Sequence, residues 1–446
     1  MDLLLKNGLI VSDGLEFTGD LAIRGGVVKA VGDLNGVEAT KVIDCTGKII
    51  LPGAVDLGVN LFDNGDFDPE SGAGFSMTSR HAALGGVTTL VSAVEMVKDE
   101  DVSVTIRSQQ EVDEKKAYVD FGYHIIVPDW NAGTIEKARA ATLAGVPSFW
   151  IRRTQCDGSN LPAPALLYAA LKELPADTLA IVSPFEAALH LVHAKRLQAL
   201  GAAGAWKDVY PEALEASFIA SLSGIANGCA ARILVAGIST AASAMALQQV
   251  REANPQIVGA ALLPHLVYTD SDELAPATWP PVRTKKDQQA LFAMLEDGVL
   301  SAVLSDHKPR TAAEGAGKNG LPATGSATLA HFLGALHHEA SKWRLSLAAI
   351  SQCACADPAK LAGLYPKKGS LQPGSDADIV IIDPQKVRET TAGLSASPMD
   401  FKDPLERFVF QGSLEAVYLR GNAIVENGKL VESPSGKFLT RKMSLK

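Results

Sequence analysis

Cysteine, aromatic side chains and long apolar stretches are scarce in this chain. Its 446 residues include 5 cysteines, and Phe, Trp and Tyr together make up 6%. So few cysteines, in an odd number, cannot build the dense disulfide framework of a small secreted protein, and they fit a reducing compartment. The uncharged stretch most suggestive of a membrane span, 233–250, contains Ser, Thr and Gln residues that suit a buried strand and helix better than a bilayer span. We therefore predict a cytoplasmic protein without a membrane segment.

Basic side chains are also in the minority. There are 41 Lys and Arg residues against 50 Asp and Glu residues, which gives a formal net charge of −9. A nucleic-acid-binding surface needs clustered Lys and Arg to neutralise phosphates, and no stretch of this sequence concentrates them among aromatic residues. Nucleic acid is therefore not an expected partner. At this length, and with 47% hydrophobic residues, the chain can bury a large core.

The two ends of the chain differ in texture from its middle. Residues 1–52 and 366–431 contain alternating or β-branched apolar segments separated by glycine turns, which is typical of short antiparallel strands. Because both β-rich ends flank one central region, the simplest arrangement pairs them in space. We predict one small β-sandwich domain formed by residues 1–52 and 366–446.

The middle of the chain, residues 53–365, alternates short apolar strands with helical segments. This alternation is the pattern of parallel βα units, and eight such strands predict a closed (β/α)8 barrel, an α/β fold. One helix is expected to end at Gly85 and Gly86, directly before the second strand. The eight candidate strands are residues 54–61, 87–94, 119–127, 146–152, 179–185, 232–238, 256–263 and 299–305.

Several short motifs occur in a fixed order along the chain. They are PGAVDLGVN at 52–60, GGVTTLV at 85–91, LPHLVYTDSDEL at 263–274, PPVR at 280–283, SDHKPR at 305–310 and KGSLQPGSDADIVIID at 368–383. Together they resemble the amidohydrolase superfamily and, more narrowly, the cyclic amidohydrolases: dihydroorotase, allantoinase and dihydropyrimidinase or hydantoinase. The resemblance covers essentially the whole chain. It implies a distorted (β/α)8 TIM barrel together with a β-sandwich from both termini.

The resemblance also implies a metal centre that can be checked residue by residue. Active members hold two divalent metals, usually zinc, with imidazoles and carboxylates at the carboxyl ends of the strands, and the metals activate water. The six implied ligand positions are occupied by Gly58, Asn60, Trp150, Ser183, Gly237 and Asp306. Of these six residues, only the aspartate is of a type that commonly binds zinc. The sequence therefore predicts no metal site and no other cofactor.

Asp306, His307 and Lys308 form the densest polar cluster at the end of a predicted strand, where barrel enzymes place their chemistry. We take these three as the candidate catalytic residues. One interpretation gives Asp306 a structural role, in which it bonds the backbone and closes the last βα loop. The other gives it a retained binding or acid–base role.

Six further residues are candidates for binding a substrate. Trp150 either plugs the site or offers a stacking surface for a flat ring, and the others either line the mouth of the barrel or pack its loops. The candidates are Asn60, Glu95, Trp150, Ser183, His265 and Arg283. The resemblance implies an arginine at position 62 in dihydroorotases and a tyrosine at position 155 in hydantoinases. This chain has Phe62 and Gln155 there, so neither residue supports a dihydroorotase or a hydantoinase substrate. His190 and His193 fall on one face of a predicted helix and are interpreted as ordinary helix positions.

Three functions remain open from the sequence. We favour a cyclic-amidohydrolase homologue that has lost zinc-dependent hydrolysis and acts as a non-catalytic or ligand-binding member. The second is a metal-independent enzyme for a cyclic amide, imide or lactone, with Asp306 as general base and His307 or Lys308 polarising the carbonyl. The third is an assembly partner of an active paralogue. The expected partners are a small cyclic ligand and further copies of the chain, as a dimer or tetramer.

Overall fold

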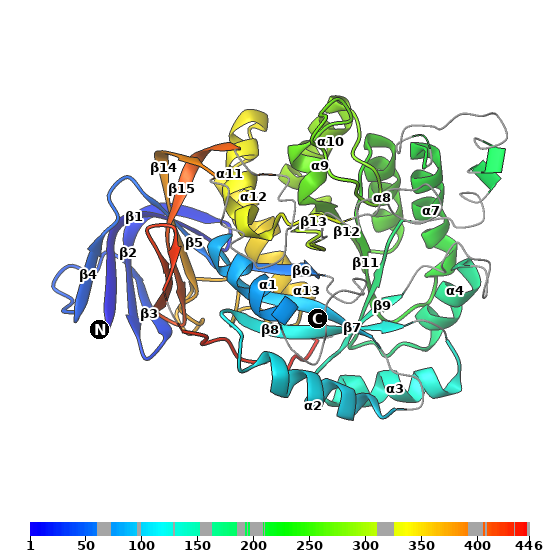
Figure 1. The fold of residues 1–446 in the computed structure, drawn as a ribbon, viewed down its shortest axis with the longest axis horizontal. Coiled ribbons are helices and arrows are strands. Elements are labelled where there is room, and N and C mark those ends of the chain that lie inside the picture. The colour runs from blue at the N-terminus through cyan, green and yellow to red at the C-terminus, as the bar shows by residue number, and fades with distance from the viewer. Residues whose placement is uncertain are drawn as a thin grey trace.

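The structure is a computed structural model in which two β-sheets organise the chain (Figure 1). One is an eight-stranded sheet built from the middle of the sequence, and the other is a nine-stranded sheet built from both ends. The structure describes residues 1–59, 73–95, 100–127, 130–151, 163–184, 192–193, 195–196, 208, 210–309, 325–390, 405, 408–431 and 433–443.

The eight-stranded sheet is the predicted barrel. All its strands pair in parallel, in the order β13-β12-β11-β10-β9-β8-β7-β6, so each strand lies beside its neighbour in sequence. All eight expected strands are present, although most are one to three residues shorter than predicted. They are β6 (Ala54–Val59), β7 (Val87–Glu95), β8 (Asp120–Val127), β9 (Ser148–Ile151), β10 (Leu179–Val182), β11 (Arg232–Ala236), β12 (Ile257–Leu262) and β13 (Leu300–Leu304).

The first and last barrel strands meet through a buried carboxylate. Asp56 on β6 is fully buried and accepts hydrogen bonds from the backbone N–H of Gly58 (2.9 Å) and of Ser305 (3.1 Å), and from the Ser305 hydroxyl. Burial raises the pKa of Asp56, and the bonds from Ser305 oppose that rise. A backbone bridge between Val59 and His307 extends the contact. The aspartate of the PGAVD motif therefore holds the barrel together at its seam.

Helices surround the barrel (Figure 1). As expected, α1 ends before Gly85, and Gly86 has the left-handed φ of +79° that ends a helix without strain. The helices are α1 (Ala73–Leu84), α2 (Val102–Asp113), α3 (Ala132–Leu143), α4 (Ala163–Glu173), α7 (Glu212–Ile225), α8 (Ala241–Ala253), α9 (Leu263–Val267), α10 (Lys285–Glu296), η3 (Leu329–His331), α11 (Phe332–Trp343), α12 (Leu347–Ser351), η4 (Gln352–Ala356) and α13 (Asp357–Leu361).

The terminal sheet combines strands that are more than 300 residues apart in sequence. β14 pairs antiparallel with β5, and β5 pairs parallel with β1, which joins the two chain ends. The strands are β1 (Leu3–Ser12), β2 (Leu15–Arg24), β3 (Val27–Gly32), β4 (Lys41–Asp44), β5 (Ile49–Pro52), β14 (Ile379–Glu389), β15 (Val409–Leu419), β16 (Asn422–Glu426) and β17 (Lys429–Leu430). The predicted fold class is thus confirmed, whereas the exact domain limits stay a prediction.

A buried ion cluster joins the terminal sheet to the barrel. The Lys368 ammonium is fully buried and lies 2.6 Å from Asp120, 2.8 Å from Asp378 and 2.9 Å from Asp376. Asp120 is the first residue of β8, and Asp378 directly precedes β14. Burial lowers the pKa of Lys368, but the three carboxylates outweigh burial and the net shift is upward. The lysine and aspartates of the KGSLQPGSDAD motif therefore fix the two sheets to each other.

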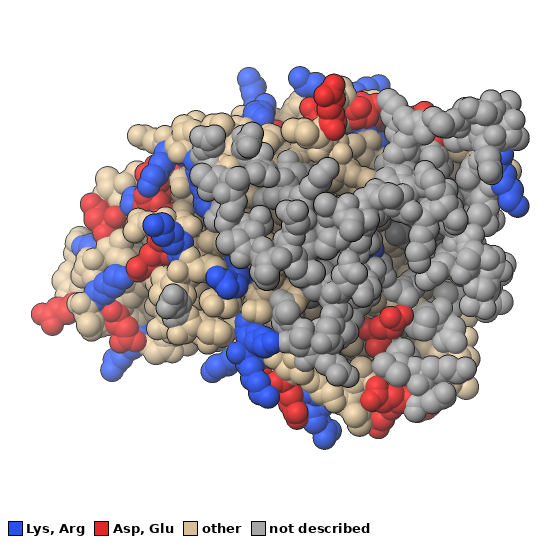
Figure 2. All heavy atoms as spheres, viewed as in Figure 1, with Lys and Arg blue, Asp and Glu red and all other residues tan. Residues whose placement is uncertain are grey.

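Among the described residues, no helix combines the length and the apolar character needed to cross a membrane. Figure 2 shows that lysine and arginine side chains are interspersed with acidic ones over the part of this face formed by the terminal sheet.

Candidate functional site

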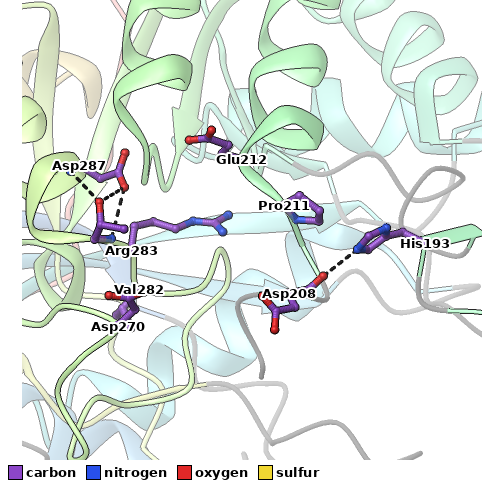
Figure 3. A pocket seen from close by; sticks show the side chains of 9 residues that line it. His193, Asp208, Pro211, Glu212, Asp270, Val282, Arg283 and Asp287 are labelled. Carbon is purple, nitrogen blue, oxygen red and sulfur yellow. Dashed lines mark hydrogen bonds between the residues drawn. The ribbon is translucent and has the colours of Figure 1, made fainter. Parts of the chain in front are cut away.

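A pocket of about 490 Å³ opens beside the carboxyl ends of the barrel strands, where α7 begins and where the connection between α9 and α10 passes (Figure 3). In (β/α)8 enzymes the active site lies at this end of the barrel. Described residues that line the pocket are His193, Asp208, Pro211, Glu212, Asp270, Val282, Arg283, Thr284 and Asp287.

Arg283 is the cation of this pocket, and buried groups hold it in place. Its Nε donates to the Ser239 hydroxyl (3.1 Å), and its Nη2 donates to a Glu215 oxygen (3.4 Å). Glu215 lies on α7 and is fully buried, while the Arg283 side chain is 9% exposed. Burial raises the pKa of Glu215, and the charge of Arg283 opposes that rise. Since Nη1 makes no described hydrogen bond, the guanidinium can still donate toward the pocket.

The wall around Arg283 is fixed by a helix cap and a backbone bond. The Asp287 carboxylate accepts from the Thr284 hydroxyl (2.6 Å) and from the backbone N–H of Ala241 (3.0 Å), and thereby ties α10 to α8. The backbone N–H of Asp270 donates to the carbonyl of Arg283 (2.8 Å). The pocket wall therefore has a rigid frame on this side.

His265 lies behind this wall and not on its surface. Its ring is 2% exposed, and Nε2 is 2.9 Å from the carbonyl oxygen of Pro280 and 3.3 Å from the Thr278 hydroxyl. Burial lowers the pKa of His265 to about 4, and the backbone of Pro280 opposes that shift. A neutral His265 supports the segment that carries Arg283. Of the two residues expected at the pocket mouth, the structure places Arg283 on the pocket and His265 beneath it.

The three candidate catalytic residues lie together at the other side of the barrel mouth, directly after β13. Asp306 is half-buried and has a left-handed φ of +53°, a conformation that aspartate adopts more readily than most residues. His307 is fully buried, and neither ring nitrogen makes a hydrogen bond. Burial lowers its pKa, and the nearby His81 lowers it further. The backbone of Lys308 donates to the carbonyl of Ser326. Their catalytic roles stay predictions.

The remaining candidates are spread around the mouth. Trp150 is half-buried near the end of β9, and its ring meets the ring of His124 edge to face at 6.2 Å. Glu95 is the last residue of β7, and Ser183 follows β10, so both occupy strand ends as expected. Asn60 and His190 lie outside the described residues. His193 lines the pocket and bonds the carbonyl of Asp208 (2.7 Å), a position that its helical spacing did not indicate.

The described residues do not fit the pair of metal ions that the fold family implies. A Cβ on Gly58 would lie 2.7 Å from the Cβ of Leu304, and a Cβ on Gly237 would lie 3.0 Å from the Cδ of Pro280. A side chain at position 58 would therefore clash with β13, and one at position 237 would be crowded and would need the left-handed φ of +98° that favours glycine. Within the described ranges, no three His, Cys, Asp or Glu residues gather as a metal site requires.

Comparison with known proteins places the chain in a family. A model described as the amidohydrolase family matches residues 182–424, more than half of the chain, so the chain belongs to the amidohydrolase family. A D-hydantoinase of Ralstonia pickettii is 28% identical and covers 99% of both chains, and an L-hydantoinase of Paenarthrobacter aurescens is 27% identical over 99% of this chain and 98% of its own.

Solved structures agree with the sequence relatives. A D-hydantoinase structure matches with a TM-score of 0.88 at 25% identity, and the dihydropyrimidinase from Brevibacillus agri matches with a TM-score of 0.87 at 25% identity. Each alignment covers 99% of both chains. Within the family, the chain therefore groups with the cyclic amidohydrolases.

These relatives overturn the functional prediction made from the sequence. The expectation of a non-catalytic or ligand-binding member is wrong, because the proteins that match end to end are hydantoinases and dihydropyrimidinases. The two alternatives, a metal-independent enzyme with Asp306 as general base and an assembly partner, are set aside with it. Six ligand positions taken one at a time were weaker evidence about function than a match over the whole chain.

Sequence reasoning also missed the groups that position the site. Glu215 and Ser239 hold Arg283, and Ser148 and Arg441 hold His124. None of the four belongs to a motif. The available signal was a charge in an otherwise apolar segment: Glu215 stands on the buried face of α7 beside Phe218, Ile219 and Leu222.

Proposed function

We propose that the protein hydrolyses a ring carbon–nitrogen bond of a cyclic amide or ureide of the hydantoin or dihydropyrimidine type. The observation that carries this proposal is the end-to-end match, in sequence and in both sheets, to proteins named hydantoinase and dihydropyrimidinase. Shared fold is weak support for shared chemistry when only a barrel is shared. Here the match extends through the barrel, its connections and the terminal sheet.

The pocket offers one element of this chemistry. Opening the ring places negative charge on the carbonyl oxygen, and a fixed donor aimed at that oxygen lowers the barrier. Arg283 has an Nη1 without a described partner, and its remaining nitrogens are anchored to Glu215 and Ser239. We assign Arg283 the role of binding and polarising a ring carbonyl. Because the guanidinium is anchored before the substrate arrives, little reorganisation is needed.

The direct test is turnover by the purified full-length protein. Hydantoin, both enantiomers of a 5-substituted hydantoin, and dihydrouracil are offered, with dihydroorotate and allantoin as rings of the related enzymes. Mass spectrometry of the ring-opened product measures hydrolysis. We expect turnover of a hydantoin or of dihydrouracil. A folded protein that opens neither of these two ring types would contradict the proposal.

The role of Arg283 is tested by Arg283→Lys, which keeps a cation opposite Glu215 but loses the planar fork of donors. We expect kcat/KM to fall on the order of 100-fold. The matched control is Arg251→Lys, since Arg251 bonds the carbonyls of Gly298 and Val299, just ahead of β13 and at the opposite end of the barrel from the pocket. Equal activity losses in the two variants would remove the assignment.

Two further expectations accompany this function as proposals. The protein acts in the cytoplasm and assembles as a dimer or tetramer of identical chains. Light scattering of the purified protein measures the second, and a monomer at micromolar concentration would remove it.

A further inference from the structure

The C-terminal segment, residues 433–443, runs along the amino-terminal edge of the barrel. The backbone N–H of Phe121 donates to the carbonyl of Lys437 (3.0 Å), the N–H of Leu439 donates to the carbonyl of Phe121 (2.7 Å), and the N–H of Arg441 donates to the carbonyl of Gly145 (2.9 Å). The side chains of Leu439 and Met443 join the hydrophobic cluster inside the barrel. The segment therefore closes the barrel at the end opposite the pocket.

Arg441 extends from this segment into the barrel interior. It is 1% exposed, and its Nε lies 3.1 Å from the place where a Cβ on Gly122 would stand, so a side chain at position 122 would press against Arg441. Nη2 donates to the carbonyl of Tyr123 and to the Ser148 hydroxyl (2.6 Å). Burial lowers the pKa of Arg441 to about 9, which still leaves it charged at neutral pH.

Ser148 connects Arg441 to His124. The Ser148 Oγ lies 2.7 Å from Nδ1 of His124 and 3.3 Å from the carbonyl of Tyr123. Because Arg441 can only donate, Ser148 accepts from it, and the Ser148 hydroxyl thereby links Arg441 to Nδ1 of His124. Nε2 of His124 is buried and has no hydrogen-bond partner among the described residues. Burial, followed by the charge of Arg441, lowers the pKa of His124 well below its usual value.

His124, the last residue in this series of contacts, lies next to a residue of the barrel mouth. His124 meets Trp150 edge to face at 6.2 Å, and Trp150 stands near the end of β9 at the position that the family resemblance gives to a metal-bridging lysine. His124 therefore lies directly beneath Trp150.

We propose that Arg441 is a positioning residue for the barrel mouth: through its bond to Ser148 it holds the His124 ring under Trp150. Arg441 does not touch substrate. It links the closing of the barrel by residues 433–443 to the geometry of the opposite end. The part of this proposal that concerns turnover rests on the proposed ring hydrolysis, whereas the part that concerns His124 does not.

The test is ¹⁵N NMR of the imidazole nitrogens in the full-length protein at neutral pH. We expect the Nδ1 resonance of His124 to report its bond to Ser148, whichever of the two groups donates. In both Ser148→Ala and Arg441→Met, this resonance should move toward the value of a nitrogen without that bond. A Nδ1 resonance that stays in place in Arg441→Met would overturn the proposal. So would one that stays in place in Ser148→Ala, a variant that leaves the backbone contacts of residues 433–443 intact.

The matched control is Leu439→Ala, which trims an apolar anchor of the same segment without touching Ser148. We expect it to leave the Nδ1 resonance unchanged, and an equal shift there would mean that Arg441 acts only by docking the segment. In turnover assays, Ser148→Ala should lower kcat on the order of 10-fold with little change in KM, and unchanged kcat would remove the functional half. If no ring is turned over by the unsubstituted protein, the proposed function fails while the NMR result still decides the role of Arg441.

Discussion

Two buried cations, Lys368 and Arg441, are stabilised in opposite ways. Lys368, at the junction of the sheets, has three aspartates within 2.9 Å. Arg441, inside the barrel, bonds a carbonyl and a hydroxyl and has no carboxylate partner among the described residues. Attraction outweighs burial at Lys368 and raises its pKa, whereas burial alone acts on Arg441 and lowers its pKa to about 9.

The difference indicates what each region is built for. A buried charge costs several kcal/mol unless opposite charges surround it, and removing one partner of a compensated cluster exposes that cost. The junction is compensated, so its residues are expected to be indispensable for stability. The barrel interior holds Arg441 without a carboxylate partner among the described residues, so replacing Arg441 should cost little stability. The proposed role of Arg441 is therefore to position His124.

The largest effect is expected at the junction. Lys368→Met leaves Asp376 and Asp378 buried without their cation and leaves Asp120 with Arg420 alone, so the free energy of unfolding should fall by about 3–5 kcal/mol. Urea-induced unfolding measures it. The control is Lys360→Met, whose ammonium pairs with Asp357 at 2.9 Å but is 43% exposed, and which should cost less than about 1 kcal/mol. Similar losses in both variants would show that the junction is not held by charge.

An intermediate effect is expected where a buried base is neutral. His265 has a pKa of about 4 in the folded protein, against about 6.5 when unfolded. Between these values the unfolded chain binds more protons, so stability is complete above about pH 6.5 and is lost as the pH falls toward 4, by up to about 3 kcal/mol. Unfolding of the protein and of His265→Gln at several pH values measures this. An equally steep loss in His265→Gln would assign it to other groups.

The smallest effect is expected at Arg441. Replacing an uncompensated buried cation by an apolar side chain of similar length is often neutral or stabilising. Arg441→Met should therefore change the free energy of unfolding by no more than about 1 kcal/mol destabilising, or should increase it. Urea-induced unfolding beside Lys368→Met gives the comparison. A loss as large as that of Lys368→Met would show that Arg441 is a structural anchor, and the contrast between the two cations would then disappear.

Most of the barrel could be predicted because its signals are local. Each strand is a short apolar run bounded by helical segments, and the glycines at 85 and 86 mark a helix end whatever the rest of the chain does. Strand ends shifted by one to three residues because pairing with neighbours, and not composition, decides where a ladder stops.

The site was less predictable because its supporting contacts cross the fold. Arg283 was expected at the mouth, but Glu215, 68 residues away, is what holds it there. Ser148 and Arg441 are 293 residues apart. No spacing rule connects such positions. The expectation of a non-catalytic protein failed for a related reason. It was based on six ligand positions, whereas the match to the relatives extends over 99% of the chain.

By itself the sequence determined the alternation of strands and helices, the β-rich ends and the segments that resemble cyclic amidohydrolases, because periodicity and turn residues act over a few positions. Only the tertiary structure decided which charges are compensated, which histidine lines a pocket and which lies behind its wall, and that residues 433–443 close the amino-terminal end of the barrel. Those outcomes depend on distances between remote segments, and the energy of a buried charge is set by the groups that packing brings within a few ångströms of it.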